Sequence, residues 1–187
     1  MANRSMLKAQ LRSAWQHTIE RHYQRQLINS ERGLQAFLCA ELLDRFEHDG
    51  VAQNRRIFIE PTLVVGRSNA VRKPDIVICN SRSIIGVVEL KYKPKGHPRT
   101  KKDLETLDWM ASHPEGVRVQ NDRYLGVVRD DRAYPLVGDA VLCWAGVHMG
   151  MAEPVSQQIS PRMKKYFVEL HAVTKPDDDP VIGRHSV

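Results

Sequence analysis

Three charged residues lie at unusual positions within KPDIVICNSRSIIGVVELKYKPKG, residues 73–96. Asp75 opens one apolar run, whereas Glu89 and Lys91 lie at the end of the next. Because alternate residues of a strand share a face, Glu89 and Lys91 are expected to point to the same side of a sheet. If the two runs pair as a hairpin through the turn-prone NSRS, Asp75 lies near them. The sequence therefore predicts that two carboxylates and one ammonium group meet at one edge of a sheet.

This combination of groups suits phosphodiester chemistry. Two carboxylates held together repel each other and lose hydration, and a hard divalent cation offsets both costs. Mg²⁺ typically takes one or two carboxylates together with waters and phosphate oxygens. A lysine beside such a metal can orient or deprotonate water and stabilise charge on a phosphate. We therefore expect hydrolysis of a phosphodiester by metal-activated water, with Mg²⁺ or Mn²⁺ as the cofactor.

Simpler explanations exist for each residue taken singly. Asp75 follows Pro74 and is acceptable as the first residue of a strand. Glu89 and Lys91 are acceptable as a surface ion pair along a strand edge, which contributes little to stability. These explanations do not account for the clustering of all three residues between apolar neighbours.

The charge balance favours a polyanionic partner, nucleic acid first. The net charge is +6 and the isoelectric point is near 9.4, and phosphate contacts supply most non-specific nucleic-acid affinity. A basic run without an interrupting acid follows Lys91, and we expect it to contact the substrate backbone; its members are Lys93, Lys95, Arg99, Lys101 and Lys102. The alternative is an ordinary solvated charged face.

An amphipathic helix is predicted over residues 5–28. Its apolar stripe recurs at four-residue spacing through Leu7, Leu11, Trp15 and Ile19. Such a stripe packs either on the core of its own chain or on a partner subunit, so a homodimer is one expectation.

Two further helices flank the charged strands. The first lies within residues 29–50, where Ser30 is a suitable N-cap, Glu31 is favoured by the helix dipole and Gly50 can end the helix in the left-handed conformation. The second is predicted over residues 101–112. Its acids, Asp103 and Glu105, could approach the charged edge, but solvated helix charges are the favoured interpretation.

The remaining apolar segments have the composition of strands. RRIFIEPTLVVG, DIVICN and SIIGVVELKY are rich in Val and Ile, and YLGVV and AVLCWAGVHM predict two more strands. PRMKKYFVELHAV is compatible with a final helix, and the tail that contains DDDP is typical of disorder. The order helix, three strands, helix, strand, strand predicts one α/β domain around a mixed sheet.

The motif PD at residues 74–75, followed by ELK at residues 89–91 on the next strand, resembles the signature of the PD-(D/E)xK nuclease superfamily. That superfamily includes restriction endonucleases, Holliday-junction resolvases and many repair or defence nucleases. The resemblance covers residues 30 to about 128. It implies a restriction-endonuclease-like αβββαβ core, a mixed sheet flanked by helices, here with an extra N-terminal helix.

The resemblance also assigns roles to the charged residues. By position, Asp75 and Glu89 are the metal-binding carboxylates, and Lys91 is the catalytic lysine. The backbone carbonyl of Leu90 is a further metal ligand. Many members of the superfamily also carry a Glu on the helix before the strands.

The sequence offers two matches for this helix carboxylate. The superfamily's Glu is often followed four residues later by Gln, and ERGLQ has this form with Glu31 and Gln35. Glu41 lies on the same predicted helix and is the alternative. We prefer Glu31, although a first-turn Glu also has a capping reason to be there.

These observations lead to a set of expectations for the whole chain. Residues 1–29 form an N-terminal helix packed on the core or a partner, residues 30–172 a nuclease-like domain, and residues 173–187 a disordered tail. The main hypothesis is a Mg²⁺-dependent DNA endonuclease of repair, recombination or defence; the alternative is a catalytically inactive nucleic-acid-binding or assembly subunit of the same fold. No apolar run has the length of a membrane span and no signal-peptide core is present, so a cytoplasmic protein is expected.

Overall fold

The computed structural model describes residues 2–65, 68–120, 123–125, 128–130, 132–150 and 154–185. Its helices are α1 (Ala2–His17), the π-helical segment η1 (Thr18–Tyr23), α2 (Glu31–His48), α3 (Lys101–Ser112) and α4 (Pro161–Lys164), with short 3₁₀ turns at Ala52–Asn54, Pro114–Gly116 and Val155–Gln157. Its strands are β1 (Arg56–Ile59), β2 (Leu63–Val65), β3 (Ser68–Arg72), β4 (Ile76–Cys79), β5 (Ile84–Lys93), β6 (Val117–Gln120), β7 (Arg123–Leu125), β8 (Val128–Asp130), β9 (Ala133–His148), β10 (Phe167–Lys175) and β11 (Asp178–His185).

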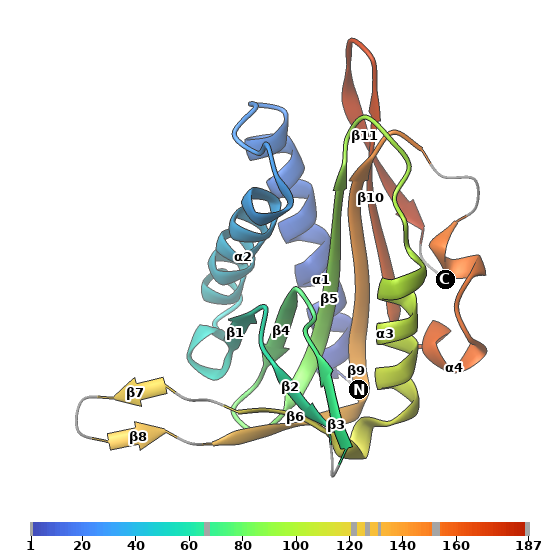
Figure 1. Cartoon of the computed structure of the whole chain (residues 1–187). Helices are drawn as coiled ribbons and strands as arrows, with labels where there is room; N and C mark the ends of the chain where they lie inside the picture. Colours follow the sequence, from blue (N-terminus) through green and yellow to red (C-terminus); the bar gives the residue numbers. More distant parts are fainter. Residues whose placement is uncertain are drawn as a thin grey trace.

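A mixed sheet forms the centre of the molecule (Figure 1). β4 pairs antiparallel with β1 and with β5, and β9 runs parallel to β5 and to β10. β11 pairs antiparallel with β10, while the start of β9 pairs antiparallel with β6, which leads on to β2 and β3. The short β7–β8 ribbon extends away from the rest of the fold in Figure 1. The α/β class with a mixed sheet flanked by helices is therefore confirmed.

The predicted hairpin between the two charged runs is confirmed. β4 and β5 pair with Ile76 opposite Val88 and Val77 opposite Val87. Asn80 stabilises the turn, because its Oδ1 accepts hydrogen bonds from the backbone N–H groups of Arg82 and Ser83. This local pairing brings the start of β4 next to the end of β5, because the strands run in opposite directions.

The helix α1 packs within the chain's own core. Leu7, Leu11, Trp15 and Ile19 are all buried, and the Trp15 indole N–H donates to the carbonyl of His171 on β10 at 3.2 Å. The apolar stripe is therefore buried within the chain's own fold and is not available to a partner subunit. The stripe thus no longer supports the expected homodimer.

The two other long helices cover opposite faces of the sheet. α2 begins as predicted, with the Ser30 hydroxyl accepting from the Gly33 N–H at 3.1 Å, and ends at Gly50 in the left-handed conformation with φ +67°. α1 and α2 bury the face that carries Val88 and Leu90 of β5. α3 covers the opposite face, where it packs with Val77 and Val87.

Two expectations for the C-terminal part are wrong. PRMKKYFVELHAV forms only one helical turn, α4, before the chain enters the strand β10, because its β-branched and aromatic residues pair in parallel with β9. The segment that was expected to be disordered contains β11, which pairs with β10 from Asp178 to His185; residues 186–187 lie outside the described part of the chain. A strand at a sheet edge has one solvated side, so polar residues do not prevent it from forming.

Two smaller points complete the comparison with the sequence. All three cysteines, Cys39, Cys79 and Cys143, are free and buried. Within the described residues, none of the helices combines the length and the apolar character that crossing a membrane requires.

Candidate active site

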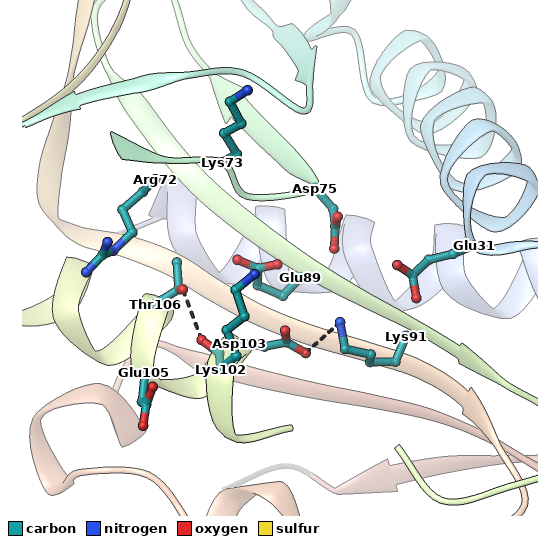
Figure 2. A pocket seen from close by; sticks show the side chains of 10 residues that line it. All are labelled: Glu31, Arg72, Lys73, Asp75, Glu89, Lys91, Lys102, Asp103, Glu105 and Thr106. Atoms are coloured by element: carbon teal, nitrogen blue, oxygen red, sulfur yellow. Dashed lines mark hydrogen bonds and ion pairs between the residues drawn. The ribbon is translucent and has the colours of Figure 1, made fainter. Parts of the chain in front are cut away.

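Asp75, just before β4, and Glu89 and Lys91 of β5 lie in one pocket of about 560 Å³. Figure 2 shows that its walls come from α2, the end of β3, the β4–β5 hairpin and α3. The lining residues are Glu31, Arg72, Lys73, Asp75, Glu89, Lys91, Lys102, Asp103, Glu105 and Thr106. A neighbouring hollow of about 340 Å³ shares Glu31 and Asp75 with this pocket. The structure therefore brings together four residues that the sequence had singled out: Glu31, Asp75, Glu89 and Lys91.

Asp75 is fixed both by its side chain and by its backbone. Its Oδ2 accepts from the Leu90 N–H at 2.6 Å, which places the carboxylate across the hairpin at the end of the strand pair. Its carbonyl accepts from Gln35 Nε2 at 2.7 Å and from the Glu60 N–H at 2.9 Å. Glu60 has a left-handed backbone with φ +46°, an uncommon conformation for a residue with a side chain. Donors from α2, from β5 and from the residue after β1 thus leave Asp75 little freedom to move.

Glu89 is a buried carboxyl beside another carboxylate. It is 7% exposed, and its pKa is raised to about 9, first by burial and then by the negative charges of Asp75 and Asp103. Burial also raises the pKa of Asp75, although the Leu90 N–H opposes this. The pair therefore binds a proton at neutral pH, because the Lys91 ammonium only partly offsets the burial and mutual repulsion of the two carboxylates.

Lys91 forms an ion pair with Asp103 of α3. Its Nζ lies 3.0 Å from Asp103 Oδ2 (Figure 2). It also donates to the Leu90 carbonyl at 3.1 Å. Burial lowers the pKa of Lys91, but the Asp103 carboxylate outweighs burial and the pKa is raised overall. Lys91 is thus a cation in the folded protein.

The choice between the two helix carboxylates can be made from their positions. Glu31 lines the pocket, and its Oε2 accepts from the Tyr92 N–H at 3.1 Å. Glu41 lies elsewhere on α2, where it contacts His17 at 3.2 Å and His22 at 2.8 Å. Glu31 is therefore the helix carboxylate that accompanies Asp75.

The basic residues of the pocket only partly match the predicted set. Lys102 lines the pocket together with Arg72 and Lys73, whereas other members of the predicted basic run, Lys93, Lys95, Arg99 and Lys101, are exposed outside its lining. Lys101 pairs with Glu105 at 4.0 Å on the surface of α3. The chain turns away from the site after β5, so that most of this run does not face the carboxylates.

The donor types at the site fit a hard cation. Among the described residues, no three Asp, Glu, His or Cys side chains form a ready-made metal site. Asp75 and Glu89 nevertheless place two carboxylates side by side, next to the Leu90 carbonyl, and Mg²⁺ commonly takes two carboxylates and completes its shell with water. A cation there would offset the repulsion that raises the pKa of Glu89. The residues present therefore fit Mg²⁺ with several water ligands.

A scan against family models gave no match, and a search of curated proteins found no significant similarity.

Sequence reasoning missed Arg72 and Lys73 and favoured the wrong alternative for Asp103. Arg72 and Lys73 precede β4 in an unremarkable polar stretch, and nothing in the sequence predicted that they face the carboxylates. Asp103 was assigned to the solvated surface of its helix but is buried. The available signal for Asp103 was its position one turn before Leu107, which places it on the apolar side of α3.

Proposed function

We propose that this protein is a Mg²⁺-dependent nuclease that hydrolyses phosphodiester bonds in DNA. The observation that carries the proposal is the convergence of Asp75, Glu89 and Lys91 in one pocket that also contains Arg72 and Lys102. Two carboxylates suit a divalent cation, and the nearby cations suit the phosphate groups that approach it.

The order of elements supports assignment to the PD-(D/E)xK nucleases and their restriction-endonuclease-like fold. Helix α2 is followed by β1, β4 and β5 in antiparallel order, then by α3, and then by β9 parallel to β5. This series corresponds to αβββαβ, with β2 and β3 as additions between β1 and β4. Its last strand is β9 and not the expected strand YLGVV, because the described part of that segment belongs to the separate β7–β8 ribbon, so the series extends beyond residue 128. The proposed signature residues lie on β5 and just before β4, as the resemblance implies.

Each residue of the site has a proposed role. Asp75 and Glu89 hold the metal together with the Leu90 carbonyl, and Glu31 assists from the N-terminus of α2. When bound, Mg²⁺ supplies positive charge and an activated water. Lys91 carries a proton in the folded state, so we assign it the orientation of water and the stabilisation of phosphate charge, not the removal of a proton from water.

The substrate backbone is proposed to cross the pocket between the carboxylates and the basic residues Arg72, Lys73 and Lys102. The adjoining hollow, which shares Glu31 and Asp75 with the pocket, offers room for the chain to continue beyond the reacting phosphate. The net charge of +6 supports a polyanionic substrate.

Cleavage of supercoiled, linear and branched DNA, with RNA in parallel, tests the proposal. Each substrate is incubated with purified protein and Mg²⁺, Mn²⁺ or chelator. Asp75→Asn is expected to abolish cleavage and Lys91→Met to reduce it by roughly 100-fold or more. Two exposed residues provide matched controls, Glu47→Gln on α2 and Lys164→Met on α4, which should leave cleavage unchanged.

Metal-dependent cleavage that survives both Asp75→Asn and Lys91→Met would sink the assignment. Salt-sensitive DNA binding without cleavage under either metal would instead support the alternative, a catalytically inactive nucleic-acid-binding or assembly subunit. Preferential cleavage of RNA would keep the chemistry and change the substrate.

A further inference from the structure

Asp103 joins the pocket lysine to the buried core. Its Oδ2 lies 3.0 Å from Lys91 Nζ and accepts from the Trp144 indole N–H at 3.4 Å. A first-turn acid is stabilised by the helix dipole even when fully solvated, yet Asp103 is only 5% exposed. The helix N-terminus alone does not explain this burial, whereas the two contacts do.

Trp144 is itself held in place by the sheet. In the parallel pairing of β5 with β9, Trp144 lies opposite Glu89 and Gly146 lies opposite Lys91. The Trp144 ring covers Gly146 so closely that a Cβ at residue 146 would lie 2.4 Å from ring atom Cη2. Only a glycine leaves room for this ring, which in turn directs its N–H toward Asp103.

The contacts of Lys91 define the direction of its remaining donor. A lysine ammonium has three N–H donors on a flexible stem. One donates to the Leu90 carbonyl and one to Asp103. The third is left for a group inside the pocket, where Asp75 and Glu89 also lie.

We infer that Asp103 is a positioning residue, seated by Trp144 on Gly146, that holds the Lys91 ammonium in one orientation toward the reacting phosphate. The inference rests on the proposed nuclease function for the role of the phosphate, but the arrangement of the side chains is independent of it. Asp103 acts through Lys91 and contacts no substrate.

Lysine ammonium NMR on the metal-free protein tests the arrangement without any activity measurement. A slowly exchanging ammonium signal is expected in the wild type, and its disappearance in Lys91→Arg assigns it to Lys91. Asp103→Asn should remove the signal, because the neutral amide no longer holds the cation. Glu105→Gln, on the same helix and at the same pocket, should leave it intact. A signal that persists in Asp103→Asn would overturn the inference.

Steady-state kinetics then separates positioning from metal binding. Asp103→Asn is expected to lower kcat by roughly 10- to 100-fold, as for other residues that orient a catalytic group. KM for DNA and the half-saturating Mg²⁺ concentration should stay within about twofold, and Asp103→Glu should recover part of the loss. A parallel rise in the Mg²⁺ requirement would make Asp103 a metal ligand and refute the positioning role. If the wild type cleaves nothing, the proposed function fails, and the NMR signal still decides the arrangement.

A double-mutant cycle tests the seat beneath Asp103. Gly146→Ala should weaken the Lys91 signal in the wild-type background by displacing the indole. In a Trp144→Phe background the same substitution should cause little further loss, because the smaller ring does not reach the new methyl group. Trp144→Phe alone removes the N–H donor without adding volume, and thermal unfolding of each variant verifies that it is folded. If Gly146→Ala weakened the Lys91 signal equally in the wild-type and the Trp144→Phe backgrounds, the link between Gly146 and Asp103 would be refuted.

Discussion

Glu89→Gln is expected to make the metal-free protein more stable, and the gain should increase with pH. The pKa of Glu89 is raised in the fold to about 9, from an ordinary value of 4.5, by burial and by the neighbouring carboxylates. A raised pKa means that the folded state keeps a proton which the unfolded chain releases. The contribution of protonated Glu89 to the free energy of unfolding is therefore fully present below pH 4.5 and is lost as the pH rises toward 9.

The size of the effect follows from the same values. In the unfolded chain Glu89 has its ordinary pKa of 4.5. A pH of 7 lies about 2.5 units above this pKa, so Glu89 is ionised in the unfolded chain. At about 1.4 kcal/mol per unit, this ionisation favours unfolding by about 3 kcal/mol. Glutamine resembles the protonated carboxyl and can donate to Asp75 without titrating. The variant should therefore gain up to about 3 kcal/mol at pH 7, which corresponds to a rise in Tm of roughly 6–12 °C.

Chemical denaturation of both proteins between pH 4.5 and 8.5 measures this difference directly. Subtracting the two stability curves cancels the titration of groups that do not interact with Glu89, so that the remaining slope belongs to the pair of Glu89 and Asp75. The matched control is Glu105→Gln, which removes a carboxylate from the same pocket where its side chain is 66% exposed. Its stability should change by less than about 0.5 kcal/mol at any pH in this range.

Magnesium provides a second arm of the same experiment. If the proposed metal site exists, Mg²⁺ at a hundred times its dissociation constant should stabilise the wild type by about 2.7 kcal/mol. Glu89→Gln should lose most of that gain because one of its two carboxylate ligands is gone. A variant no more stable than the wild type at pH 7, with a flat difference curve, would refute the reasoning about the paired carboxylates.

Three further outcomes are expected. Burial alone would raise the pKa of Glu169, but the His171 ring and two backbone N–H groups outweigh burial and lower the pKa. The stabilisation that ionised Glu169 gives to the fold is therefore present above about pH 4.5 and is lost as the pH falls further. Glu169→Gln should therefore flatten the acid limb of the stability curve, and an unchanged limb would contradict this. Gln35→Ala removes a donor to the Asp75 carbonyl and should cost about 1–2 kcal/mol in urea unfolding; a neutral result would mean that water replaces the amide. Lys102→Ala should lower the salt dependence of DNA affinity by about one unit of log K against log salt, and an unchanged slope would remove Lys102 from the proposed interface.

The part of the site that the sequence predicted depends on short-range pairing. Asp75, Glu89 and Lys91 are brought together by one hairpin, and strand alternation with a four-residue turn suffices to place them. Glu31 follows from the capping pattern at the start of α2. The α/β class follows from the switch between helical and strand periodicity along the chain.

The residues that were missed depend on how distant elements pack. Asp103 becomes part of the site only because α3 lies against β9, where Trp144 offers an N–H that no periodicity predicts. Arg72 and Lys73 reach the pocket through the position of β3, which is decided by pairing with β2. The error over β11 has the same origin, because an isolated polar segment gives no sign that a neighbouring strand will accept it.

The contact between α1 and β10 has a consequence for synthesis on the ribosome. Trp15 and Lys8 of the first helix donate to carbonyls of His171 and Phe167, which are separated from them by more than 150 residues. α1 can pack on α2 as soon as both helices are translated, because their apolar residues share one cluster. Its hydrogen bonds to β10, in contrast, can form only after nearly the entire domain has been translated. Contacts between residues so far apart in the sequence slow folding, because the entropy of loop closure must be overcome before they form. A stalled chain that lacks β10 would thus carry its hairpin carboxylates on an unfinished core.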